Sequence, residues 1–236
     1  MKHRVESFYC DTKNFLSIPM LGKHMLNTAE DHATDLEIIH PKDEVVWVLA
    51  RLNLELDVIP RVGAYYDINT WISKNYRGVF TDRCFNIVDD KGCEIGRSKT
   101  VWSLIDFKSR QSVNILDFYP DFDSFITDDE VKIKAFPKLK VKDMPEVAQR
   151  EVLYSHLDKN CHLNSIAYIE FALDTFDLDY HSKMRVSALE VSYHNETLFG
   201  ATLSIRRIKA DDETYHFAFY NDTTCVCRVK LSFVNI

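Results

Sequence analysis

The feature that most constrains the fold is a run of alternating apolar and polar residues between Val46 and Val58. Apolar side chains occupy every second position, and polar ones, among them Arg51, Asn53 and Glu55, lie between them. A helix cannot gather such a set on one face, whereas a strand does, because its successive side chains point to opposite faces. The run therefore predicts a long antiparallel strand with one buried face.

The rest of the first half predicts one helix and further strands. Apolar residues recur at three- and four-residue spacing from Leu21 to Leu36, which indicates an amphipathic helix. Ser17 is its expected cap, and Pro19 falls near its first turn. The other expected strands are residues 4–10, 65–73, 77–88 and 94–107. Together these elements predict a sheet wrapped around one helix.

The second half repeats this order. The expected helix is residues 164–176, and the expected strands are residues 147–153, 184–193, 197–209, 214–221 and 225–234. A short sequence motif recurs as well. In the first half Leu54-Glu55-Leu56 is followed by Gly63-Ala64, and in the second half Leu189-Glu190-Val191 is followed by Gly200-Ala201. Prolines and aspartates interrupt the pattern between the halves. We therefore expect a first domain over residues 1–107, a linker over 108–145 and a second domain over 146–236.

Composition excludes several classes of function. The net charge of −7 argues against nonspecific binding of nucleic acid. No apolar run approaches the ~20 residues of a membrane span, and the six cysteines form no zinc-type C-x-x-C pair. The N-terminal residues have neither the apolar core of a signal peptide nor the features of a transit peptide. We expect a cytoplasmic protein without a metal or another cofactor.

The stretch of residues 154–170 holds the clearest candidate site. Asp158, Asn160, His162 and Asn164 occupy every second position just before the second predicted helix. If this segment is extended, the four side chains share one face. Asn164 or Ser165 is the expected helix cap, and the N–H groups at a helix start can stabilise a carbonyl oxygen that gains charge. The alternative is a capped helix with ordinary polar loop residues before it.

This D-x-N-x-H-x-N pattern, followed by Tyr168, resembles the active-site signature of the acyl-ACP thioesterases. The segment Leu189–Thr197 resembles another family element, in which a Tyr is followed three residues later by a catalytic Glu, here Glu196. Family-like residues of the first half are Trp47-Val48-Leu49-Ala50-Arg51, Pro60, Gly63, Trp71 and Trp102. The resemblance implies an α+β fold, a tandem (double) hot-dog with two central helices, each wrapped by an antiparallel sheet, and with the sheets continuous.

The function that the resemblance implies is hydrolysis of fatty acyl-acyl carrier protein to free fatty acid. Asp158, Asn160, His162 and Glu196 would be catalytic, and Asn164 and Tyr168 would support them. We expect Glu196 to be the general base for water, and Asp158 to be a partner carboxylate or a nucleophile. Asn160 would hold the thioester carbonyl, and His162 would position or protonate a reacting group. The first half has no evident counterpart of these four residues, so one site per chain is expected, with the first half shaping the acyl pocket.

Two departures from the family pattern bear on this expectation. Thr197 follows Glu196 where plant members carry a cysteine, which excludes a thiolate nucleophile at that position. His156 stands where relatives often carry an acid. Five lysines in the linker suggest a docking patch for the acidic carrier protein, although a solvated connector explains them more simply. These are Lys132, Lys134, Lys138, Lys140 and Lys142.

Other functions stay open at this point. An acyl-CoA thioesterase would use the same chemistry with a different carrier for the acyl group. A non-catalytic acyl-binding hot-dog protein is the alternative from another class, because a fold alone does not define a function. Glu30, Asp31 and His32 would be the catalytic set of a dehydratase, although a polar helix face explains them more simply. A homodimer is a possible assembly.

Overall fold

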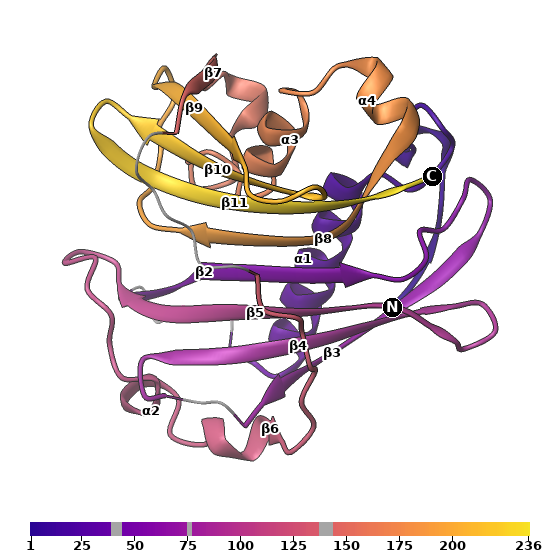
Figure 1. Ribbon diagram of the computed structural model, residues 1–236. Helices are drawn as coiled ribbons and strands as arrows, with labels where there is room; N and C mark the ends of the chain where they lie inside the picture. Colours follow the sequence, from indigo (N-terminus) through magenta and orange to yellow (C-terminus); the bar gives the residue numbers. More distant parts are fainter. Residues whose placement is uncertain (39–43, 75–76, 137–143) are drawn as a thin grey trace. The chain divides into compact units, whose positions relative to one another are not determined.

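The computed structural model describes residues 1–38, 44–74, 77–136 and 144–236. It divides into two compact units, Met1–Ile133 and Lys134–Ile236, each built from helix and antiparallel sheet (Figure 1). The structure thus assigns residues 108–133, interpreted from the sequence as part of a linker, to the first unit. No helix within the described ranges is both long and apolar enough to cross a bilayer.

The first unit is organised around helix α1 (Ile18–Asp35), as predicted. The Ser17 hydroxyl accepts a hydrogen bond from the backbone N–H of Met20, and Pro19 lies in the first turn. These two residues start the helix because Ser satisfies an unpaired N–H and Pro has none to satisfy. Leu21 and Met25, on the apolar stripe, are fully buried.

The sheet of the first unit has the strand order β1-β3-β4-β5-β2, all antiparallel. Its strands are β1 (Lys2–Arg4), β2 (Val45–Leu56), β3 (Tyr65–Ser73), β4 (Phe80–Asp89) and β5 (Glu94–Asp106). The prediction of a strand over residues 4–10 was wrong. The strand ends at Arg4, and residues Ser7–Tyr9 form the short 3-10 helix η1, which the Tyr9 N–H closes by donating to the Glu6 carbonyl.

Strand β2 matches the alternating run but contains a bulge that the alternation hides. Leu49 pairs with Trp102 and Arg51 pairs with Val101, so Ala50 is an extra residue in the ladder. A bulge shifts the side-chain phase by one position. Consequently the buried position before the bulge is odd-numbered, Val45. The buried positions after the bulge are even-numbered, namely Leu52, Leu54 and Leu56.

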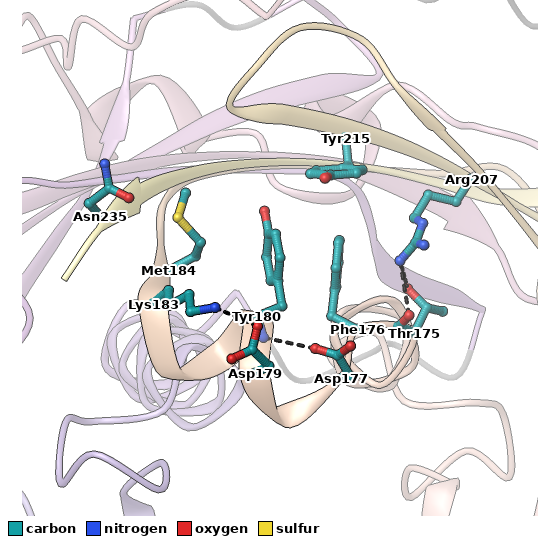
Figure 2. A pocket seen from close by; sticks show the side chains of 10 residues that line it. All are labelled: Thr175, Phe176, Asp177, Asp179, Tyr180, Lys183, Met184, Arg207, Tyr215 and Asn235. Carbon is teal, nitrogen blue, oxygen red and sulfur yellow. Dashed lines mark hydrogen bonds and ion pairs between the residues drawn. The ribbon is translucent and has the colours of Figure 1, made fainter.

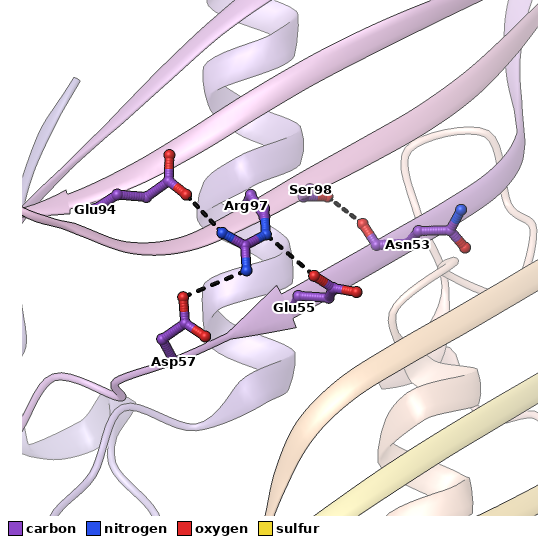
Figure 3. Close-up of polar contacts among 6 residues, drawn as sticks. All are labelled: Asn53, Glu55, Asp57, Glu94, Arg97 and Ser98. Atoms are coloured by element: carbon purple, nitrogen blue, oxygen red, sulfur yellow. Dashed lines mark hydrogen bonds and ion pairs between the residues drawn. The ribbon is translucent and has the colours of Figure 1, made fainter. Parts of the chain in front are cut away.

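Charged residues of β2 and β5 meet on the solvent-facing side of the first sheet (Figure 3). Arg97 lies directly opposite Glu55 in the ladder and contacts it at 3.1 Å through Nε. Its Nη1 lies 2.9 Å from Glu94 and its Nη2 lies 3.5 Å from Asp57. The hydrogen bond to Glu55 is the main cause that raises the pKa of Arg97. Such partly exposed pairs contribute little to stability singly, but they specify the register of the two strands.

Residues 115–127 carry elements that the sequence did not reveal. Helix α2 (Ile115–Phe118) and the 3-10 helix η2 (Phe122–Phe125) are followed by β6 (Ile126–Thr127), which pairs in parallel with β3. Ile115 and Phe122 are fully buried and belong to one apolar cluster with Ile72 and Leu104. Their burial attaches this segment to the core of the first unit.

The second unit repeats the arrangement with the strand order β8-β11-β10-β9-β7. Its elements are β7 (Glu146–Glu151), the 3-10 helix η3 (Tyr154–His156), α3 (Ala167–Leu173), α4 (Leu178–Lys183), β8 (Met184–Tyr193), β9 (Thr202–Lys209), β10 (Thr214–Asn221) and β11 (Thr224–Asn235). The predicted helix to residue 176 ends at Leu173. Asp177 then caps α4 by accepting a hydrogen bond from the Tyr180 N–H, which starts a new helix.

Candidate active site

The polar stretch before α3 forms a tight turn closed by Asp158. One carboxylate oxygen of Asp158 accepts hydrogen bonds from the backbone N–H groups of Asn160 (2.9 Å) and His162 (3.0 Å). The Asp158 N–H donates to the carbonyl of His162, and Cys161 has a left-handed φ of 62°. An Asp side chain often folds back in this way onto N–H groups two residues or more ahead. The expectation of an extended segment at this point was therefore wrong.

The prediction that Asn164 or Ser165 caps the second helix was wrong, because α3 begins at Ala167 and its N-cap is Ile166, without a side-chain cap hydrogen bond. Asn164 instead closes the turn that leads into the helix. Its side-chain oxygen accepts a hydrogen bond from the Ile166 N–H at 2.9 Å, and its own N–H donates to the carbonyl of His156. Helix α3 then begins at Ala167. Asn164 links η3, the turn and the helix in one backbone frame.

Glu196 lies in the loop between β8 and β9, and not on a strand, because β9 begins only at Thr202. Gly200 turns this loop with a φ of 77°, and its N–H donates to the carbonyl of Val152. The prediction of a strand from residue 197 was wrong because residues 197–201 bend at this glycine before they join the ladder.

Backbone contacts bring the two loops together. His162 forms a β-bridge with Leu198, and the Leu163 N–H donates to the carbonyl of Thr197 at 2.8 Å. As a result, Nε2 of His162 lies 3.4 Å from a carboxylate oxygen of Glu196. The two side chains are 26% and 43% exposed, so water reaches both. The separation exceeds the ~2.7–2.9 Å of a tight charge-assisted hydrogen bond.

Tyr168 supports this arrangement from the core. It is 3% exposed, and its hydroxyl lies 2.9 Å from the hydroxyl of Thr197, which is 1% exposed. Its ring packs edge-to-face against Tyr193 and Phe219. Thr197 is a site residue that the sequence interpretation missed. Its position next to Glu196 was the available clue, but it was considered only as a departure from the plant pattern.

Burial keeps the two tyrosines near the loops neutral. Desolvation is the first cause that raises the pKa of Tyr168, and the hydrogen bond to Thr197 opposes it. Burial also raises the pKa of Tyr193 well above its ordinary value. Its hydroxyl donates to the carbonyl of Ser165 at 2.9 Å. Neither phenol is therefore suited to exchange protons with a substrate near neutral pH.

The remaining predicted residues are more exposed. Asn160 lies on the surface of the turn, and Lys132 and Lys134 are exposed as well. Three further lysines of the expected docking patch lie outside the described residues; they are Lys138, Lys140 and Lys142. Among the residues that the structure describes, no group of three or more His, Cys, Asp or Glu side chains is placed to hold a metal ion.

A separate pocket of about 430 Å³ lies beside α4 in the second unit (Figure 2). The Arg207 guanidinium donates to the Thr175 carbonyl at 2.9 Å and stacks on the ring of Phe176. Tyr180 and Tyr215 complete the aromatic part of the lining. None of the residues that line this pocket belongs to the predicted site, so it is a different feature of the unit.

Comparison with known proteins identifies the class of the fold. The structure superposes on an acyl-ACP thioesterase from Bacteroides thetaiotaomicron with a TM-score of 0.88 and 31% identity, over 99% of this chain and 96% of that one. A 12:0-ACP thioesterase from Umbellularia californica gives a TM-score of 0.90 at 18% identity, over 100% and 96% of the two chains. The fold is thus a tandem hot-dog, as predicted.

Family models match both halves of the chain. The model of the acyl-ACP thioesterase N-terminal domain matches residues 1–121, and that of the C-terminal domain matches residues 139–230. The chain belongs to the acyl-ACP thioesterase family. A palmitoyl-acyl carrier protein thioesterase of Cuphea hookeriana, a chloroplastic protein, is 23% identical over 81% of this chain. The chain spans about half the length of this relative, 50%.

Proposed function

We propose that this chain hydrolyses the thioester of fatty acyl-acyl carrier protein and releases free fatty acid for lipid metabolism. The observation that carries the proposal is the His162–Glu196 pair, a solvent-accessible imidazole and carboxylate 3.4 Å apart. A thioester needs a base to activate water and donors for the developing oxyanion. Membership of the acyl-ACP thioesterase family supports the same reaction.

In the proposed mechanism, Glu196 accepts a proton from the attacking water. The water oxygen bonds to the carbonyl carbon, the carbon–sulfur bond then breaks, and the carrier leaves as a thiol after it takes up a proton. His162 positions the water or returns that proton. Asn160, exposed on the turn, donates its amide N–H to the carbonyl oxygen.

Asp158 has a different part in this proposal. Its carboxylate oxygen already accepts two backbone N–H groups, including that of His162. We assign it the task of holding the turn that presents Asn160 and His162, in preference to direct attack on the thioester. Asn164 and Tyr168 support the turn and the neighbouring loop through the contacts described above.

Several finer assignments belong to the proposal as well. The acidic carrier protein would approach exposed lysines such as Lys132 and Lys134. We place the reaction in the cytoplasm, supported by six cysteines that are all free thiols, as expected in a reducing compartment. A homodimer is the proposed assembly to test by light scattering.

Steady-state hydrolysis of matched acyl-ACP and acyl-CoA substrates over a range of chain lengths tests the function. We expect kcat/KM to be at least ~10-fold higher on acyl-ACP, because a carrier-protein surface adds contacts that CoA lacks. A preference for acyl-CoA would make the chain an acyl-CoA thioesterase. Tight acyl binding without turnover of either substrate would make it an acyl-binding module.

A further inference from the structure

Thr197 is the point at which three parts of the second unit meet. Its carbonyl accepts the N–H of Leu163, the residue after His162. Its hydroxyl lies 2.9 Å from that of Tyr168 on α3, and Glu196 precedes it in the chain. The Thr197–Tyr168 contact therefore ties the Glu196 loop to the helix through a side-chain hydrogen bond.

The first unit has no such hydrogen bond at the corresponding place. There the Leu16 N–H donates to the carbonyl of Pro60 at 2.8 Å, which matches the bond from Leu163 to Thr197. Leu21 follows Leu16 at the same interval as Tyr168 follows Leu163, and it is fully buried. A proline and a leucine thus make the same backbone frame with apolar side chains. The frame itself does not need the hydroxyl pair.

Burying a pair of hydroxyls is energetically more demanding than burying a pair of apolar side chains. Each hydroxyl loses its hydrogen bonds to water on burial and must find a partner in the protein. An apolar pair would be buried there without this free-energy cost. The Thr197 and Tyr168 hydroxyls satisfy each other inside an apolar and aromatic surrounding that includes Phe219. The pair holds Thr197, and with it the Glu196 backbone, at a fixed position relative to α3.

We propose that the Thr197–Tyr168 hydrogen bond is a positioning contact that sets the place of the Glu196 carboxylate opposite His162. The inference rests on the proposed function, because it assigns these two residues to the same site. A displacement of about 1 Å at a catalytic group can lower the rate ~100-fold. Neither Thr197 nor Tyr168 touches the reacting atoms, so both act through Glu196.

A double-mutant cycle separates positioning from stability. The variants are Thr197→Val, Tyr168→Phe, the two combined, and Thr197→Ser as the matched control that keeps a hydroxyl. Each single change leaves one buried hydroxyl without its partner, whereas the double change removes both. We therefore expect the double variant to recover the Tm of the wild type but to keep a kcat ~10-fold or more below it, with KM within ~2-fold.

The Thr197→Ser control and an NMR measurement that is independent of turnover complete the test. Thr197→Ser should retain kcat within ~3-fold of the wild type. The ring signals of His162 in a 1H–15N correlation spectrum should differ from the wild type in the double variant and coincide with it in Thr197→Ser. Recovery of both Tm and kcat in the double variant, or unchanged His162 signals, would overturn the proposal. Since the spectrum needs no turnover, it still decides the point if the wild type hydrolyses neither thioester.

Discussion

The turn that begins at Asp158 has a close copy in the first unit, and the comparison separates the frame of the site from its chemistry. Asp11 accepts the N–H groups of Lys13 (2.8 Å) and Phe15 (3.0 Å), as Asp158 accepts those of the two corresponding residues. Asn14 has a φ of 64°, beside 62° for Cys161. The expectation that the first half lacks a counterpart of Asp158 was therefore wrong.

The two copies differ in the side chains that they present. Lys13 and Phe15 occupy the places of Asn160 and His162. The residue before Pro60 is Ile59, which is 5% exposed, whereas the residue before Thr197 is Glu196. Both units thus build the same turn, but in the second unit the turn carries an imidazole that meets a carboxylate from the neighbouring loop. The Asp is common to both, which identifies it as part of the frame.

The largest effect expected from this comparison concerns the two aspartates. Asp158→Asn keeps an oxygen that can accept the two N–H groups, so kcat should stay within ~10-fold of the wild type. Asp158→Ala removes the acceptor, and kcat should fall ~100-fold as the turn loosens. Steady-state rates and Tm of both variants check this expectation.

The matched pair in the first unit is the control. Asp11→Ala should lower the free energy of unfolding by about 1–2 kcal/mol through the same lost hydrogen bonds, yet leave kcat within ~2-fold. If Asp158→Asn were as inactive as Asp158→Ala while as stable as the wild type, the carboxylate charge itself would take part in the reaction, and the assignment to the frame would fail.

A smaller expected effect concerns the response of the first unit to acid. Burial, followed by the charges of His24 and the amino terminus, lowers the pKa of His3 from 6.5 to about 4, while Asp67 opposes the shift. Between these values the unfolded chain binds a proton that the folded chain resists. Stability should therefore be complete above pH 6.5 and fall as the pH drops toward about 4.

Tryptophan fluorescence isolates this effect, because all three tryptophans, Trp47, Trp71 and Trp102, lie in the first unit. Urea unfolding at pH 4.5, 5.5 and 6.5 should give a midpoint that rises with pH. His3→Gln removes one of the titrating groups and should flatten the rise. An equal slope in the variant and the wild type would mean that His3 is not shifted.

The sequence predicted what depends on periodicity and missed what depends on single backbone angles. The limits of α1 and β3 followed from apolar spacing and from the Ser17 and Pro19 start of the helix. Strand β2 also followed, but its bulge at Ala50 did not, because an alternating pattern gives no sign of an extra residue. Helix α4 has six residues and too few apolar positions to show a helical period.

The candidate site was predictable in its residue types and less so in its geometry. The alternate spacing from Asp158 to Asn164 indicated a site, but it places the four side chains on one face only if the chain is extended. Cys161 adopts a left-handed φ that few non-glycine residues take, and the turn that results was invisible in the sequence. The meeting of His162 with Glu196 depends on a bridge across 36 residues between His162 and Leu198, which only the fold supplies.

The most direct test of the account is the kcat of Glu196→Gln on acyl-ACP. Glutamine keeps the size and polarity of the side chain but cannot accept a proton from water, and a general base typically contributes ~100- to 10,000-fold. The account predicts a loss of kcat in that range with KM and Tm unchanged. A variant that turns over within ~10-fold of the wild type would contradict the claim that the chemistry of this chain resides in the His162–Glu196 pair of its second unit.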